Sequence, residues 1–441
     1  MNDDIINILN LKHSDVQSCT PKRISNSLFY YITLTKQEVI CTTCLSLLKT
    51  KEYKTKKIKH QIIRDTDTTI FYRARRYYCP SCHTTHYEHN PFSSTNSNLS
   101  HQTIISILKF LKEPSSTFAL ASRLYKISNS KIVDLFDTYC QMSKRPLTKA
   151  ICIDEFYAIR SSKEKYVCMI IDFSTGTILD VLFGRTKSNW ITYAQYLTDK
   201  ERNTVRYISI DMYDTYRFAA KQYFKNATIC VDSFHVIKNI NQLLKNTRIK
   251  VMKSYDSDSI EYYLLKKFNW LLMYDSSKVP DTPAKYNKKL KRYISYPQLL
   301  ERMLTIDSIL KQAYELKEDY LIFNSTSTLS NAKENLAHII QVYINSDIES
   351  YRNFASTTLI KWFKEIVNSF SIVDGRRISN GPIEGTNPRV KTILKVANGF
   401  KNFSRMRNKI MYCLNKDALI TVMKALQVIK QKGKPRGKYK K

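Results

Sequence analysis

Two aspartates stand at the ends of short apolar segments, where buried strands would reach the edge of a sheet. Asp154 ends the first segment and Asp211 ends a later one. If these segments are neighbouring strands, their carboxylates form a hard-oxygen site for Mg²⁺ or Mn²⁺. Two such ions about 4 Å apart activate the attacking oxygen and stabilise the leaving oxygen in phosphodiester displacement. Glu155 and Asp214 are alternatives, because acids at strand ends also occur where a chain simply meets water.

A third acid, Glu384, lies in a glycine-rich setting within a chain that has only 8 glycines. Half of those glycines fall between positions 375 and 399. Asn380-Gly381-Pro382 predicts the start of a helix, because proline suits a first turn. On a continuous helix, Lys391 and Lys395 share the face of Glu384, so metal and phosphate contacts would lie side by side. An ordinary capped surface helix is the alternative.

Four of the ten cysteines form two C-x-x-C pairs, one on each side of a basic, strand-rich stretch. Each pair can place two thiolates on one tetrahedral ion, and two pairs complete a closed structural zinc site. The predicted Zn²⁺ ligands are Cys41, Cys44, Cys79 and Cys82. Coincidence among buried thiols is the alternative, and neighbouring histidines could compete as ligands: His83, His86 and His89.

The overall charge indicates the kind of partner. The 441-residue chain carries 71 lysines and arginines against 38 acids, a formal net charge of +33. Such a balance favours a polyanion, and nucleic acid is the commonest one. No glycine precedes Gly176 and no nucleotide-binding fingerprint occurs, which argues against NTP-driven chemistry. We also find no apolar run long enough to span a bilayer and no signal-peptide pattern, so no membrane partner is expected.

A basic strand and two short helices provide candidate DNA contacts. The predicted strand 69–78 carries three arginines, and the segments 117–125 and 131–136 predict two helices joined by a tight turn. A Ser-capped second helix after such a turn is typical of a helix-turn-helix, although any small helical hairpin looks similar. The predicted DNA-binding residues of this region are Arg73, Arg75, Arg76 and Lys131.

From position 150 the chain changes to short apolar strands. The predicted order is three strands, a helix, a strand, a helix and a strand, which is the order of a ribonuclease-H-like core. In that topology the first and fourth strands are neighbours, which places Asp154 beside Asp211. The predicted strands are 151–156, 166–172, 177–183, 205–211 and 228–232, and the predicted helices are 190–200 and 215–224.

Several motifs occur in the order found in one known family. They are the paired cysteines, Ile153-Asp154-Glu155-Phe156, Ile210-Asp211-Met212, Asp232-Ser-Phe-His235-Val236 and Asn380-Gly381-x-x-Glu384-Gly385-x-Asn387. From about residue 38 to about residue 415 the sequence resembles the ISL-three family of bacterial insertion-sequence transposases. The resemblance implies a DDE-type core in which Asp154, Asp211 and Glu384 bind Mg²⁺ or Mn²⁺. It also implies an all-helical insertion between the last core strand and the catalytic helix.

The Asp232-x-x-His235 pair resembles a feature of several DDE transposase superfamilies. His235 would steer the scissile phosphate or hold Asp232 in place. Asp232 is alternatively the second metal ligand itself, with Asp211 behind it, and a purely structural Asp–His hydrogen bond is the simplest interpretation. We favour Asp211 as the ligand because its strand should adjoin that of Asp154.

Pro388 stands four residues after Glu384 and removes a backbone donor. Either the helix contains a kink at this point, or it begins at Pro388 with Asn387 as its cap. The second arrangement would leave Glu384 on a preceding turn and change its geometry toward a metal.

Together these patterns predict an α+β multidomain protein with a zinc ribbon, a helix-turn-helix and a ribonuclease-H-like α/β core that carries a long all-helical insertion. The predicted parts are a zinc-ribbon domain (1–92), a helix-turn-helix domain (93–147), the first part of the core (148–239), the insertion (240–372), the catalytic helix with the second part of the core (373–429) and a basic tail (430–441).

The predicted function is that of a DNA transposase that binds terminal inverted repeats and performs metal-dependent strand cleavage and strand transfer. Its partners would be double-stranded DNA and at least a second copy of the chain, and its location the bacterial cytoplasm, associated with the nucleoid. Two alternatives remain: a non-catalytic DNA-binding regulator on a degenerate core, and a metal-dependent nuclease without strand transfer.

Overall fold

A computed structural model describes residue 9 and residues 11–63, 66–94, 96–158 and 164–418 of the chain. The chain forms two compact units, described separately below. The first comprises residues 1–142, 392–398 and 402–441, and the second comprises residues 143–391 and 399–401. The finer division into six parts stays a prediction, and the basic tail predicted at 430–441 lies outside the described residues.

The first unit begins with a five-stranded mixed sheet of order β1-β2-β4-β3, with β5 paired to β4. Its long hairpin of β3 and β4 lies in the strand-rich stretch predicted between the cysteine pairs, with Lys49 opposite Tyr78. Side chains alternate in burial along β4, but the buried positions change from even to odd between Tyr72 and Arg75, so the two parts of the strand are covered on opposite faces. The strands are β1 (Val16–Ile24), β2 (Ser27–Leu34), β3 (Lys49–Ile63), β4 (Thr66–Tyr78) and β5 (Thr85–Tyr87), preceded by a short 3₁₀ turn (His13–Asp15).

Helices follow the sheet in the same unit, and each of the first three has a hydroxyl cap at its start. The side chain of Ser128 accepts the backbone N–H of Lys131, so the predicted serine cap of the second hairpin helix is confirmed. Their apolar faces share one core, which also includes Tyr412. The helices are α2 (His101–Leu111), α3 (Phe118–Tyr125), α4 (Asn129–Tyr139) and α16 (Phe403–Leu414).

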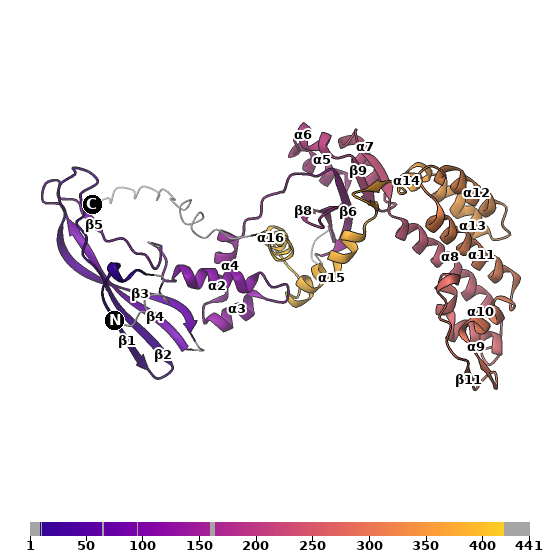
Figure 1. The fold of residues 1–441 in the computed structure, drawn as a ribbon, viewed down its shortest axis with the longest axis horizontal. Helices are drawn as coiled ribbons and strands as arrows, with labels where there is room; N and C mark the ends of the chain where they lie inside the picture. The colour runs from indigo at the N-terminus through magenta and orange to yellow at the C-terminus, as the bar shows by residue number, and fades with distance from the viewer. Residues whose placement is uncertain (1–8, 10, 64–65, 95, 159–163, 419–441) are drawn as a thin grey trace, which may run out of the picture. The chain divides into compact units, whose positions relative to one another are not determined.

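The second unit contains a five-stranded sheet, of which Figure 1 labels β6, β8 and β9. The strand order is β10-β9-β6-β7-β8. The strand β6 pairs parallel with β9 and antiparallel with β7, and β10 pairs parallel with β9. These strands correspond to the five predicted ones. Their bounds are β6 (Ala150–Tyr157), β7 (Tyr166–Asp172), β8 (Ile178–Phe183), β9 (Tyr207–Ile210) and β10 (Thr228–Val231).

The helix predicted over 190–200 is two helices, α5 (Lys187–Gln195) and α6 (Asp199–Thr204). A second helix starts because Thr198 and Glu201 form a reciprocal capping box. The next helix, α7 (Asp214–Tyr223), lies close to its predicted position.

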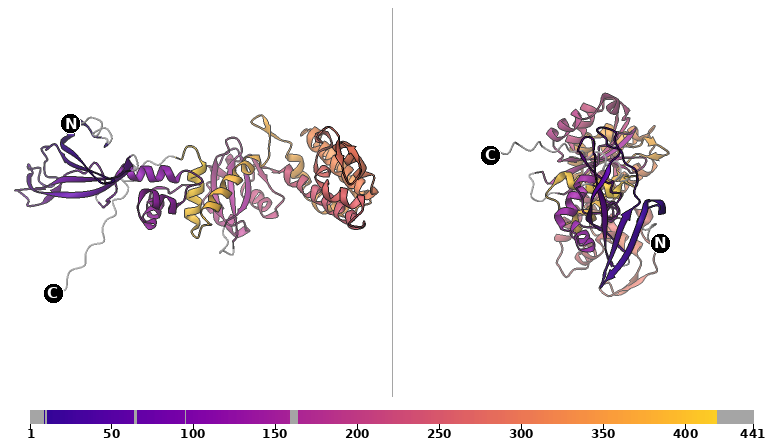
Figure 2. Two further views of the ribbon diagram at one scale, coloured as in Figure 1. Left: turned by 90° about the horizontal axis from the view of Figure 1, so that it is seen from below. Right: turned by 90° about the vertical axis from the view of Figure 1, so that its left-hand side faces the viewer.

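A long, mostly helical segment separates β10 from the later core residues, and Figures 1 and 2 show its helices gathered into one group. Within it, α11 packs along α8. The prediction of an all-helical insertion is wrong at one place, because β11 and β12 form an antiparallel hairpin. The elements are α8 (Ser233–Lys253), α9 (Ile260–Lys267), β11 (Lys285–Asn287), β12 (Arg292–Ile294), α10 (Tyr296–Leu304), α11 (Ser308–Thr326), α12 (Ala332–Ile344), α13 (Glu349–Phe354) and α14 (Phe363–Asn368), with 3₁₀ turns at Asn269–Met273 and Ser276–Lys278 and a π turn at Ala355–Leu359.

A two-stranded hairpin, β13 (Ile372–Val373) and β14 (Arg376–Arg377), then leads to α15 (Gly381–Val396). The helix runs through Pro388 without a break, so the alternative in which it begins at Pro388 is wrong. Glu384 therefore lies in the first turn, as the Asn-Gly-Pro start predicted. Within the described part of the chain, no helix combines the length and the apolar character needed to cross a bilayer.

Candidate active site

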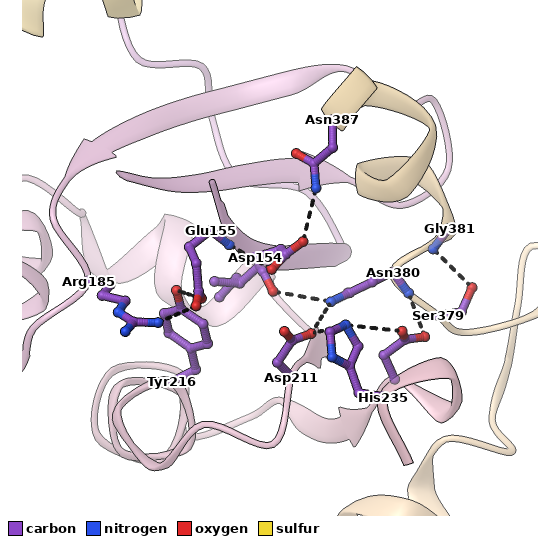
Figure 3. Close-up of polar contacts among 12 residues, drawn as sticks. Asp154, Glu155, Arg185, Asp211, Tyr216, His235, Ser379, Asn380, Gly381 and Asn387 are labelled. Atoms are coloured by element: carbon purple, nitrogen blue, oxygen red, sulfur yellow. Dashed lines mark hydrogen bonds and ion pairs between the residues drawn. The ribbon is translucent and has the colours of Figure 1, made fainter. Parts of the chain in front are cut away.

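The sheet of the second unit brings the first two predicted acids together. Ile153 of β6 lies opposite Ile210 of β9 in a parallel pair, so the residues that follow them, Asp154 and Asp211, reach the same edge. Carboxylate oxygens of Asp154, Glu155 and Asp211 lie within 4.8 Å of one another. Figure 3 shows Asp154 and Asp211 next to each other at this edge.

Glu155 shares this cluster but already has strong partners. It forms an ion pair with Arg185 and accepts a hydrogen bond of 2.5 Å from the hydroxyl of Tyr216. The guanidinium of Arg185 also stacks over the ring of Tyr166 at 4.2 Å. Through these contacts Glu155 serves as an anchor between β6 and α7.

The third predicted acid belongs to a neighbouring cluster. Ligand atoms of Asp232, His235 and Glu384 lie within 4.8 Å of one another. The imidazole Nε2 of His235 is 2.9 Å from Asp211 Oδ1 and 3.9 Å from Asp232 Oδ2, so it joins the two clusters. The structure thus places Asp154 beside Asp211, and Glu384 with Asp232 and His235.

Asn380, directly before α15, ties the two clusters to the sheet. Its side chain is fully buried, and its amide Nδ2 donates to the carbonyl of Ile153 and to Asp211 Oδ1, both at 3.3 Å. Its backbone N–H donates to Asp232 Oδ1 at 3.1 Å. One residue therefore bonds to the ends of β6, β9 and β10 (Figure 3).

Asn387, one turn after Glu384 on α15, reaches the first cluster. Its amide Nδ2 donates to Asp154 Oδ2 at 3.2 Å, and Figure 3 shows the side chain pointing from the helix toward that carboxylate. Pro388 lacks the N–H that would bond to the carbonyl of Glu384, yet the helix continues. The α15 face that carries Glu384 also carries Asn387.

Two of the acids at this edge, Asp154 and Asp232, have raised pKa values. Burial, and then the charge of Asp211, raise the pKa of Asp154 to about 7. Burial also raises the pKa of Asp232. Burial alone would lower the pKa of His235, but the hydrogen bond and charge of Asp211 raise it. A cation between these carboxylates would reverse the repulsion that raises their pKa values.

The residues present fit a divalent metal ion. Among the described residues, Asp232 Oδ2, Asn380 Oδ1 and Asn387 Oδ1 are buried oxygens without a hydrogen-bond partner. Such atoms are rare in folded proteins because an unpaired buried polar group is costly. Carboxylate and amide oxygens are the ligands that Mg²⁺ prefers, and both clusters supply them.

The four predicted zinc ligands of the first unit also meet. Their sulfur atoms lie within 4.8 Å of one another, with Cys41 and Cys82 at 3.4 Å and Cys44 and Cys79 at 3.3 Å. Thr84 and His86 border the cluster, and His86 Nε2 is 3.4 Å from Cys41 Sγ. Four cysteines within this distance match the ligand set of a closed zinc ribbon site.

The two cysteine turns have the same backbone. The amides of Leu45 and His83 each donate at 3.0 Å to the carbonyl of the first cysteine of their turn. Both residues have left-handed backbones, with φ of 62° and 59°. Each turn is therefore a local backbone structure that orients its two thiols in the same direction.

One predicted DNA contact is wrong. Arg75 is only 1% exposed and forms a 2.6 Å ion pair with Glu88. It also donates to the carbonyl of Leu34 and to Gln17 Oε1, both at 2.8 Å. Because its guanidinium links β4 to its neighbours, it is unavailable for DNA.

The other predicted contacts are more accessible. Arg73 is exposed and stacks over Tyr53 at 4.2 Å, whereas Arg76 is partly exposed and paired with Glu52 at 2.7 Å. Lys131 in α4 is exposed, as are both lysines of α15 named from the sequence, Lys391 and Lys395. Their role in DNA binding stays a prediction.

Sequence reasoning predicted no contact with the acids for three side chains that make one: Asn380, Asn387 and Arg185. Asn387 follows Glu384 by three positions, so helical spacing alone places both on one face. For Asn380 and Arg185 the sequence holds no such signal, because their partners come from distant strands.

Comparison with known proteins identifies the family. The model of the ISL-three DDE family, described as a transposase, matches residues 151–410. The chain belongs to this family of transposases, as the resemblance of its motifs predicted. No curated protein matches the sequence at a significant level.

Proposed function

We propose that this chain is the transposase of a bacterial insertion sequence, which cuts DNA at the element's terminal inverted repeats and transfers the freed ends to target DNA. The observation that carries the proposal is the meeting of Asp154 and Asp211 on adjacent parallel strands, beside a helix whose first turn presents Glu384. Membership of the transposase family supports the same chemistry.

Divalent cations would be held by Asp154 and Asp211 on one side and by Glu384 on the other. When bound, such ions activate an attacking oxygen and stabilise the leaving oxygen of a phosphodiester. Asp232 Oδ1 accepts from Asn380 and so holds the loop before α15, while its Oδ2 has no hydrogen-bond partner among the described residues. We favour Asp211 as the second carboxylate because its strand, β9, pairs with the strand of Asp154, β6.

The protein's other residues would position the acids and the DNA. His235 donates to Asp211 and stands between the two clusters, where it would also meet the scissile phosphate. Asn380 and Asn387 orient Asp211 and Asp154. Lys391 and Lys395, exposed on α15, would contact phosphates of the strand that is cut.

Recognition of the ends would fall to the first unit. A zinc ribbon around the four cysteines and a helix-turn-helix of α3 and α4 would bind double-stranded DNA, with sequence recognised mainly in the major groove. Arg73, Arg76 and Lys131 would add contacts. Two ends must be held together during transfer, so a homodimer or higher assembly on the nucleoid DNA is expected.

The test is strand cleavage of labelled DNA that carries the element's ends, with Mg²⁺ or Mn²⁺. We expect cleavage and end joining by the unmodified protein, and loss of both with unchanged DNA binding in Asp154→Asn and Glu384→Gln. Equal cleavage by all three proteins would remove the proposed site. Binding without any cleavage by the unmodified protein would instead indicate a regulator, and cleavage without end joining a nuclease.

Binding itself has a salt signature. If phosphate contacts dominate, raising the salt from about 50 to 200 mM should weaken binding by roughly 10³-fold or more. A much smaller change would mean that the net charge of +33 does not act on the DNA backbone.

A further inference from the structure

The β11–β12 hairpin of the insertion concentrates positive charge on a small exposed surface. Its five cations are all exposed, and no acidic residue occurs between Asp281 and Glu301. Within the described part of the chain, no carboxylate forms an ion pair with any of them. They are Lys285, Lys288, Lys289, Lys291 and Arg292.

Two tyrosines stand on the same hairpin. Tyr286 and Tyr293 are direct cross-strand partners, and their ring centroids are 5.3 Å apart. They are 55% and 71% exposed. Tyrosine rings normally bury much of their apolar surface, so a pair left this open is a candidate binding surface.

Hydrogen bonds and core packing hold the backbone of the hairpin in place, so its exposed side chains have a defined position. Asn287 is buried and accepts the backbone amides of Lys289 and Leu290 at 3.1 and 3.2 Å. Leu290 and the buried Ile294 pack against the main core of the second unit. Figure 1 shows β11 beside α9 and α10.

A hollow of about 640 Å³ opens beside the exposed ring of Tyr293. Its lining includes Gln298 and Arg302, and also the acids Glu261 and Glu301. Those carboxylates would repel a phosphate but can accept hydrogen bonds from the amino groups of a base. The hollow therefore suits a base, while the phosphates belong on the lysine side.

We propose that the β11–β12 hairpin binds an unpaired DNA strand, with its cations on the phosphates and its tyrosines stacked on exposed bases. Bases inside a duplex are already stacked on one another, so two open rings gain a partner only where bases are exposed. This inference rests on the proposed function, because strand cuts and strand transfer at staggered positions are what would leave unpaired segments near the protein.

The direct test measures binding of the full-length, zinc-loaded protein to an unpaired strand of about 16 nucleotides by fluorescence anisotropy. We expect the triple change Lys288→Ala, Lys289→Ala and Lys291→Ala to weaken binding and to lower the slope of log affinity against log salt by about 2. Unchanged affinity and slope would overturn the proposal.

A matched control removes the same charge from other exposed lysines of the insertion: Lys311→Ala, Lys333→Ala and Lys364→Ala. Affinity should fall far less in this control than in the hairpin variant. An equal loss in both would mean that general charge, not the hairpin, attracts the strand, which overturns the proposal. Equal thermal midpoints show that all variants are folded.

The tyrosines are tested separately. Tyr286→Ala with Tyr293→Ala should weaken binding to the unpaired strand at least about fivefold, with a smaller effect on a duplex of the same length. Tyr286→Phe with Tyr293→Phe keeps the rings and should bind as the unmodified protein does. Equal losses on strand and duplex, or no recovery with phenylalanine, would overturn stacking.

A basic surface with aromatic rings also suits an anionic membrane, so vesicles containing anionic lipid form a further arm. Hairpin-dependent binding to vesicles, with hairpin-independent binding to DNA, would overturn the proposal.

Parallel cleavage assays separate the hairpin inference from the proposed function. If the unmodified protein cuts DNA but the hairpin variants bind the strand normally, the hairpin inference alone fails. If the hairpin binds strands but no cleavage occurs, the proposed function fails.

Discussion

The cysteine cluster and the acidic edge assemble their ligands in different ways. The four thiols form one set within 4.8 Å, whereas the acids and His235 form two neighbouring sets. Each cysteine turn is built by local hydrogen bonds, including those of Leu45 and His83. The acids come from β6, β9, the start of α8 and α15, so their positions depend on sheet register and on long-range packing.

This difference fits the roles that we propose for the two sites, a structural zinc site and a reactive metal site. The cysteine cluster is complete by itself, which suits an ion that only holds the fold. The acidic edge is open at Glu384, which is exposed, and it retains buried oxygens without partners. An open site of this kind suits the divalent ions and DNA phosphates that we propose as its ligands.

The largest expected effect breaks the closed site. Cys79→Ser removes one of the four thiolates and should abolish stable zinc binding, because zinc in such sites contributes about 10–16 kcal/mol of apparent binding free energy to folding. Elemental analysis should find about one zinc per chain in the unmodified protein and almost none in the variant.

Cys19→Ser is the matched control, because this thiol lies outside the cluster, in β1. It should leave the zinc content unchanged. The cysteine cluster would not be a metal site if the unmodified protein were folded without zinc, or if Cys79→Ser and Cys19→Ser contained equal amounts of zinc.

The next effect distinguishes the two aspartates that compete for the metal. Asp211→Asn should lower the cleavage rate by about 10³-fold or more, because it removes charge beside Asp154. Asp232→Asn should cost much less, since an asparagine oxygen can still accept the N–H of Asn380. Single-turnover cleavage rates decide, and the reverse order of losses would make Asp232 the ligand.

The meeting of Asp154 and Asp211 was predictable because it follows from strand order. Three strands, a helix and a further strand place β9 beside β6. The parallel register then brings Asp154 and Asp211 to the same edge of the sheet. The start of α15 was predictable for the same kind of reason, since Asn-Gly-Pro is local chemistry.

What the sequence left open depends on distant partners. Arg75 and Arg73 stand on the same side of a strand by alternation, yet only Arg75 is buried, because Glu88 and Gln17 reach it from elsewhere. The β11–β12 hairpin was not predicted, because it is only ten residues long and the sequence on both sides of it has helical periodicity. Its lysines and tyrosines do not by themselves indicate a turn. The turn becomes evident only from the structure, in which Lys291 has a left-handed backbone.

A smaller effect tests how the open site is held. Asn387→Ala removes the 3.2 Å hydrogen bond to Asp154 while leaving every acid in place. Loss of such a supporting bond typically weakens metal affinity by about 10–100-fold. The Mg²⁺ concentration that gives half-maximal cleavage should rise by that factor, while the rate at saturating metal falls less.

Thr386→Ala is the control for this change. Its hydroxyl bonds within α15, to the carbonyl of Pro382, and contacts no acid of the site in the described residues. The metal dependence should stay as in the unmodified protein. An equal shift in both variants would trace the effect to helix stability and not to the orientation of Asp154.

The smallest expected effect tests whether Glu155 is a metal ligand like its neighbours Asp154 and Asp211. Glu155→Gln breaks its ion pair with Arg185 and weakens the hydrogen bond from Tyr216, so the free energy of unfolding should fall by about 1–3 kcal/mol. Cleavage at saturating Mg²⁺ should change less than tenfold, because the proposed metal ligands Asp154, Asp211 and Glu384 stay in place. Tyr216→Phe, which removes only the hydroxyl, should give a smaller loss of stability and the same cleavage. If Glu155→Gln instead abolished cleavage with an unchanged thermal midpoint, Glu155 would be a metal ligand in addition to Asp154 and Asp211.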